Sequence, residues 1–103
     1  MAGPGNGAGR FTVRCSSAII ASIHAIHQRA RDQGRGKAVT SALRRIIHRL
    51  ESNPLRFGEP VYRLPSLQMQ IRTAIVRPLA VDFGVCEDRP LVFIKGVKLV
   101  SAG

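Results

Sequence analysis

The sequence of 103 residues contains no tryptophan, one tyrosine and four phenylalanines, so an extended platform for stacking single-stranded bases is not expected. Acidic residues are also scarce: six Asp and Glu stand against sixteen Lys and Arg, which gives a formal net charge of +10. Such an excess in a short chain is typical of proteins with a polyanionic partner, nucleic acid above all, or with an acidic protein partner. Simple solubility is the alternative interpretation.

Cysteines and long apolar runs are scarce as well. Cys15 and Cys86 stand far apart and in no motif, which is typical of reduced structural residues in a cytosolic protein. No apolar run approaches the roughly 18 residues that a membrane span requires. The N-terminus lacks the charged and apolar regions of a signal peptide. We therefore expect a cytoplasmic protein without a membrane partner.

The length and the apolar content of 45% fit one globular domain with a single core. Residues 1–9 hold four glycines and a proline, which predicts a flexible lead-in, and residues 10–103 form the predicted domain. The chain contains no internal repeat.

Two amphipathic helices are predicted after a short edge strand at residues 10–14. The first helix, with a serine cap, ends at about residue 32, and the second spans about residues 37–51. The short break at residues 33–36 makes the two an antiparallel hairpin. Their apolar stripes consist of Ile19, Ile23, Ile26 and Ala30 in the first helix, and of Val39, Leu43, Ile46, Ile47 and Leu50 in the second.

Three strands are predicted after the hairpin, at residues 61–76, 80–86 and 91–99, the first of them irregular in its middle. A three-residue loop at residues 77–79 and a two-residue turn at residues 88–89 place most apolar side chains on one face. That face comprises Ile71, Thr73, Ile75, Val81, Phe83, Val85, Val92 and Ile94. The predicted fold class is α+β, with a short N-terminal strand and an antiparallel helical hairpin packed on one face of a small antiparallel sheet.

The other face of the sheet is left uncovered in this register. Arg72 and Phe93 flank Gly84, where the missing side chain leaves a shallow floor. Asp82 lies across from Lys95 as a cross-strand ion pair. Cations from different strands beside aromatic rings can hold RNA phosphates and bases. The candidate RNA- or partner-binding residues are Arg63, Arg72, Arg77, Phe93, Lys95 and Lys98, with Tyr62 available for stacking.

The remaining polar residues form no recognised catalytic or cofactor motif. His24 and His27 lack further ligands at metal-binding spacing, so no metal is expected. Residues 34–37 (GRGK) lack the first glycine and the hydroxyl of a phosphate-binding loop, so no nucleotide cofactor is expected. No nucleophile accompanies His48. A solvated surface is the default interpretation of the basic outer side of the second helix, which carries Lys37, Arg44, Arg45 and Arg49.

Three segments carry a family likeness: residues 52–64 (SNPLRFGEPVYRL), 77–85 (RPLAVDFGV) and 91–97 (LVFIKGV). They are similar to the helix exit, the central strand and the last strand of the RelE/ParE toxin superfamily, and the order of elements resembles that fold over residues 11–100. The resemblance implies a toxin-like component of a bacterial type II toxin–antitoxin system. Such a protein acts on RNA at the ribosome or on gyrase, and an acidic antitoxin protein neutralises it.

Within the resemblance, one interpretation is a ribosome-dependent, metal-independent mRNA endonuclease, with an unidentified general base. Its cations would be Arg72, Arg77, Lys95 and Lys98. Residues 79–81 (LAV) replace the arginine that starts the central strand of many such toxins, and residues 101–103 are too short for their catalytic tail. These departures favour binding over chemistry. A plain basic nucleic-acid-binding protein without toxin activity is the third interpretation.

Overall fold

The computed structural model describes residues 10–100, so the predicted lead-in at residues 1–9 lies outside the described residues. The elements are β1 (Thr12–Arg14), α2 (Ser17–Asp32), α3 (Gly36–Ser52), β2 (Glu59–Leu64), β3 (Met69–Val76), β4 (Leu79–Cys86) and β5 (Leu91–Leu99), with 3-10 turns at Pro54–Arg56 and Pro65–Leu67. The predicted α+β class is confirmed.

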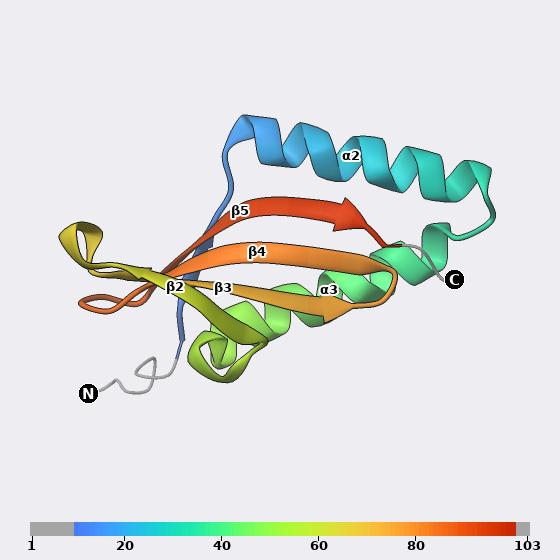
Figure 1. Ribbon diagram of the computed structural model, residues 1–103. Helices are drawn as coiled ribbons and strands as arrows, with labels where there is room; N and C mark the ends of the chain where they lie inside the picture. Colours follow the sequence, from blue (N-terminus) through green and yellow to red (C-terminus); the bar gives the residue numbers. More distant parts are fainter. Residues whose placement is uncertain (1–9, 101–103) are drawn as a thin grey trace.

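Both helices form where the sequence predicts them. The Ser16 side chain accepts a hydrogen bond of 3.2 Å from the Ile19 N–H, which caps α2. Figure 1 shows α2 running beside β5 and α3 crossing behind β3 and β4. Near the turn between the helices, the Thr40 hydroxyl lies 3.2 Å from His27 Nε2. The hairpin therefore covers one face of the sheet and leaves the other open.

The sheet has five strands in the order β1-β5-β4-β3-β2, with β1 parallel to β5 and the other pairs antiparallel. The prediction of one irregular strand over residues 61–76 was wrong. The 3-10 turn at Pro65–Leu67, followed by Gln68 at φ 47°, reverses the chain, so β2 pairs with β3 as a hairpin. No glycine marks this reversal, which is why the sequence pattern did not indicate it.

The predicted register is right between β4 and β5 and wrong between β3 and β4. Phe83 pairs with Ile94, as predicted. The β3–β4 turn holds two residues rather than three, so Phe83 pairs with Arg72 instead of Thr73. Because side chains alternate along a strand, this shift of one residue turns every β3 side chain to the other face.

The core lies between α3 and the helix-facing side of β4. Phe83 is fully buried there and stacks on Phe57, with ring centroids 5.6 Å apart. Of the predicted core residues on β3, Ile75 is 61% exposed, and Ile71 is buried on the opposite face. The buried core comprises Ala30, Val39, Ala42, Ile46, Leu50, Phe57, Ala74, Leu79, Val81, Phe83, Val85, Val92 and Ile94.

Candidate nucleic-acid interface

Arg72, predicted on the uncovered face, lies on the helix-facing side of the sheet and is only 6% exposed. Its Nε donates to the Phe57 carbonyl at 3.0 Å, its Nη2 donates to the Gly58 carbonyl at 3.1 Å, and its Nη1 donates to Gln70 Oε1. The placement predicted for this side chain was therefore wrong. Arg72 holds the segment between α3 and β2 against the sheet.

Arg63 leaves the candidate set for a different reason. Its Nε and Nη2 donate to the Glu87 carboxylate at 2.7 and 2.6 Å, beside the loop that joins β4 and β5. This hydrogen-bonded pair lowers the pKa of Glu87 below its ordinary value. A local carboxylate thus balances the Arg63 charge, which makes Arg63 a weak partner for a polyanion.

Three of the predicted residues do lie together on the uncovered face. Phe93, Lys95 and Lys98 all come from β5, and Lys95 and Lys98 are exposed. Arg14 lies beside Phe93 on the adjacent strand β1. Arg77 lies in the β3–β4 turn, at the rim of the sheet. The basic part of the uncovered face is therefore its β1–β5 side.

Tyr62 reaches across the uncovered face from β2. The Lys95 ammonium donates to the Tyr62 hydroxyl at 3.4 Å and lies 5.9 Å from the centre of the tyrosine ring. The predicted ion pair between Asp82 and Lys95 does not form in the described chain. A β-bulge shifts the register, so Asp82 pairs with Gly96 instead.

Beneath this bridge lies a cavity of about 290 Å³. Its lining consists of Val61, Tyr62, Ile71, Asp82 and Lys95. Gly84 does not provide the open floor that the sequence predicts. A Cβ atom there would lie 2.5 Å from the Met69 sulfur, because the shift in register places Met69 and Ile71 over this glycine. The centre of the face is consequently apolar rather than basic.

The aromatic side chains divide sharply between core and surface. All five lie within residues 10–100. Phe57 and Phe83 are buried and Phe11 is half-buried, whereas Tyr62 is 50% exposed and Phe93 is 36% exposed. Both exposed rings belong to the uncovered sheet face. The exposed tyrosine and phenylalanine rings of the described chain therefore both lie on this face, where each can stack on a base.

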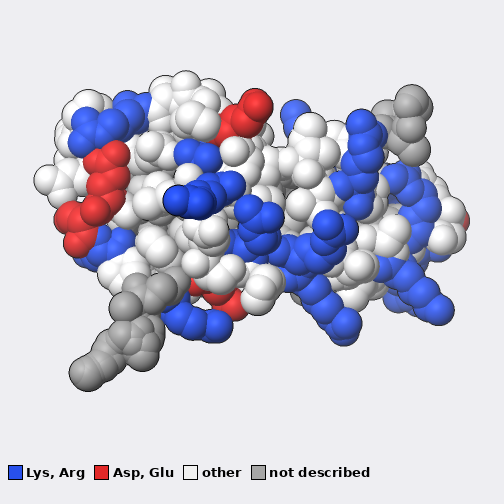
Figure 2. Space-filling model, turned by 90° about the horizontal axis from the view of Figure 1, so that it is seen from below, with Lys and Arg blue, Asp and Glu red and all other residues white. Residues whose placement is uncertain are grey.

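A second basic surface surrounds a cavity of about 310 Å³ between α3 and the end of β3. Its lining consists of Arg44, Arg45, His48, Arg49, Phe57 and Val76. Figure 2 shows Lys and Arg gathered on this side of the molecule, while the acidic residues in view lie mainly toward the other end. Sequence reasoning found the basic helix side but not the cavity, because Phe57 and Val76 come from outside the helix.

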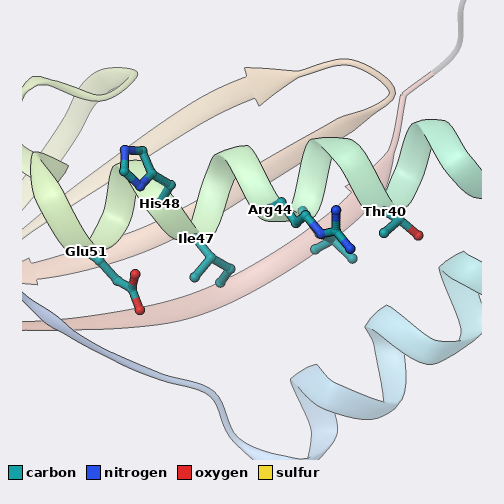
Figure 3. Close-up of a pocket in the computed structure, with 6 residues that line it drawn as sticks. Thr40, Arg44, Ile47, His48 and Glu51 are labelled. Carbon is teal, nitrogen blue, oxygen red and sulfur yellow. The ribbon is translucent and has the colours of Figure 1, made fainter.

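A groove follows the side of α3 that faces the connection between β1 and α2 (Figure 3). Its lining consists of Thr40, Leu43, Arg44, Ile47, His48 and Glu51, of which Thr40, Ile47 and Glu51 point into it. The Glu51 carboxylate, which lines the groove, pairs with Arg10 at 3.5 Å.

Other chemistry has little support among residues 10–100. No three potential metal ligands come together in this range. Neither α2 nor α3 has the length and apolar character to cross a bilayer. Cys15 and Cys86 are free thiols, and burial raises the pKa of Cys15, which disfavours the reactive thiolate.

No protein-family model, curated protein or solved structure matches this chain.

Proposed function

We propose that the protein is a toxin-like domain that binds a short segment of single-stranded RNA on its uncovered sheet face. The observation that carries the proposal is the position of the two exposed aromatic rings. Tyr62 and Phe93 both lie on this face, and Lys95 contacts one of them and follows the other on the same strand. Proteins hold single-stranded nucleic acid by this combination of stacking rings and basic groups.

Each part of the face has a role in the proposed complex. One base stacks on Tyr62 and another base of the same strand stacks on Phe93, while Lys95 and Lys98 bind phosphates between and beyond them. The cavity beside Tyr62 receives the edge of a base. Asp82 lines that cavity, and its carboxylate accepts hydrogen bonds from exocyclic amino groups, which favours bases that carry one.

The toxin-like role rests on the resemblance of residues 52–64, 77–85 and 91–97 to RelE/ParE toxins. In that role, the RNA is bound at the ribosome, and an acidic antitoxin protein neutralises the toxin by covering basic surface. We propose binding rather than cleavage. The departures of residues 79–81 from the pattern of such toxins support this choice, and the three histidines all lie on α2 and α3, away from the proposed RNA.

The test is the affinity for a fluorescent single-stranded RNA, measured by anisotropy. Tyr62→Leu and Phe93→Leu remove one stacking ring each, and we expect each to weaken binding by roughly one to two orders of magnitude, as for the loss of a stacked base. Leu55→Ala is the matched control, because Leu55 is 47% exposed but lies off the face. Equal affinities for all three variants and the wild type would reject the sheet face as the RNA site.

The toxin-like role is tested separately, by induced expression in bacteria. Growth should stop with the wild-type chain and continue when Tyr62→Leu and Phe93→Leu are combined, at equal protein levels. Co-expression of an acidic protein encoded beside this gene should restore growth of the wild type. Unaffected growth of cells that express the wild-type chain would reject the toxin-like role, while RNA binding could still stand.

A further inference from the structure

The cavity between α3 and the end of β3 lies away from the uncovered sheet face and plays no part in the function proposed above. We propose that it is a phosphate-binding site formed by Arg44, Arg45 and Arg49. This inference does not rest on the proposed function. The evidence for it is the charge of the cavity, the contacts that hold Arg49 in position, and the size of the cavity.

The charge of the cavity is not balanced by neighbouring residues. Its four basic side chains occur at positions 44, 45, 48 and 49, which lie on one broad side of a helix. Among residues 10–100, which contain all six Asp and Glu, no carboxylate forms an ion pair with any of them. The carboxylates that are paired belong to Glu51, Glu87 and Asp88. An anion would therefore meet no internal carboxylate that competes for these side chains.

One guanidinium of the cavity is held in place before any ligand arrives. Arg49 lies over the Phe57 ring at 4.9 Å and donates to the Arg56 carbonyl at 3.4 Å. The Phe57 ring also stacks on Phe83, and Arg72 donates a hydrogen bond to the Phe57 carbonyl. A guanidinium that is already positioned loses less conformational freedom on binding. A merely solvated surface arginine has no such support.

Arg72 contributes to the site in a second way. It is buried and donates to the Phe57 carbonyl, and no described carboxylate pairs with it, since its donors reach only carbonyl and amide oxygens. Its positive charge therefore adds to the potential at the cavity. The result is a basic site with an apolar wall, formed by Phe57 and Val76.

Phosphate is the anion that this arrangement fits best. A guanidinium presents a planar fork of N–H donors that matches phosphate oxygens, and several arginines together can surround a doubly charged group. A volume of about 310 Å³ accepts a phosphate together with part of the group that it esterifies. The phosphate can come from a nucleic-acid backbone or from a free nucleotide, and the experiment separates these sources.

The experiment follows amide and arginine side-chain NMR signals of the full chain during titration with inorganic phosphate, adenosine monophosphate and single-stranded RNA. We expect phosphate to shift the signals of Arg44, Arg45 and Arg49. Arg44→Gln combined with Arg45→Gln should abolish the remaining shift at Arg49. The matched control combines Arg29→Gln with Arg89→Gln, two exposed arginines elsewhere whose loss changes the net charge equally.

The three probes identify the source of the phosphate. If a strand of about twelve nucleotides binds more tightly than the mononucleotide, and the α3 double variant loses that gain, the backbone is the ligand. In that case the double variant should also lower the salt dependence of log K by about 1.4, from about 0.7 per phosphate contact. If the mononucleotide binds as tightly as the RNA and competes with it at this cavity, a free nucleotide is the ligand.

Two results would overturn the phosphate site. One is a set of shifts spread evenly over all basic surfaces, and the other is equal phosphate binding by the α3 double variant and its matched control. The Tyr62→Leu/Phe93→Leu variant separates this inference from the proposed function. It should lose RNA binding at the sheet face but keep the phosphate shifts on α3.

Discussion

Arg72→Met tests whether this arginine is a structural residue rather than a ligand-binding one. Methionine reproduces the unbranched part of the arginine side chain as far as Nε, so the change removes the guanidinium and its three hydrogen bonds while it keeps the packing of that part. A hydrogen bond from a charged donor contributes about 1.5–3 kcal/mol when its loss leaves a buried acceptor without a partner. The Phe57 carbonyl belongs to a buried residue and should carry this cost in full.

Loss of the hydrogen bonds to the other two acceptors costs less free energy. Gly58 is exposed, so water can replace the hydrogen bond to its carbonyl, and Gln70 is only half-buried. We therefore expect Arg72→Met to lower the free energy of unfolding by about 2–4 kcal/mol. For a domain of this size, the melting temperature would fall by about 10–20 °C.

Urea unfolding followed by circular dichroism measures the effect, and Arg45→Met is the control. Arg45 is exposed and forms no ion pair in the described chain, so its replacement should change the stability by less than about 0.5 kcal/mol. Equal stabilities of the two variants would refute the anchoring role of Arg72. The placement of Arg72 on the helix-facing side would then need revision as well.

Three further predictions concern the fold. Phe83→Ala should lower the free energy of unfolding by about 3–5 kcal/mol, because it empties the centre of a fully buried cluster; an unchanged urea midpoint would contradict this. Gly58→Ala should cost more than about 1 kcal/mol in the same assay, since φ is +69° and a Cβ atom would lie 2.1 Å from the Thr73 carbonyl oxygen. Glu87→Gln should make the stability of the protein fall less steeply as the pH is lowered. The lowered pKa of Glu87 stabilises the wild type above the ordinary glutamate value, and this contribution is lost as the pH falls through the lowered one. Melting curves from neutral pH to about pH 3 should therefore show a steeper decline below about pH 4 in the wild type, and parallel curves would count against the pair with Arg63.

The helices and the β4–β5 pairing could be predicted because only one helix face, and only one strand register, buries their apolar side chains. The apolar stripes of α2 and α3 fit a helical period, and the pairing of Phe83 with Ile94 is the only local register that keeps both inside. For β3, either face could point toward the core. Its residues alternate between Ile71 and Ile75 on one side and Ala74 and Val76 on the other, so both faces contain apolar side chains. The prediction placed the bulkier pair, Ile71 and Ile75, in the core.

The helices cover the β3 face that carries Arg72 and Ala74, not the face that the pattern favoured. The polarity of a single residue such as Arg72 is a weak guide to its burial. Arg72 satisfies its donors with carbonyl oxygens from a segment some fifteen residues earlier, a contact that no spacing rule indicates. The same holds for the candidate site. The predicted β4–β5 register placed Phe93 and Lys95 on the correct face, and a β-bulge that the sequence did not indicate brings Lys98 to the same face. The pairing of Arg63 with Glu87 depends on the unpredicted β2–β3 hairpin.

The central claim is that single-stranded RNA stacks on the uncovered sheet face. The most direct measurement is ultraviolet cross-linking of the protein to a single-stranded RNA, with the attached residues identified by mass spectrometry. Aromatic rings that stack on a base are among the groups that such light couples to it, so we predict cross-links at Tyr62 and Phe93. Cross-links found only on α2 and α3, with both β2 and β5 free of them, would contradict the claim.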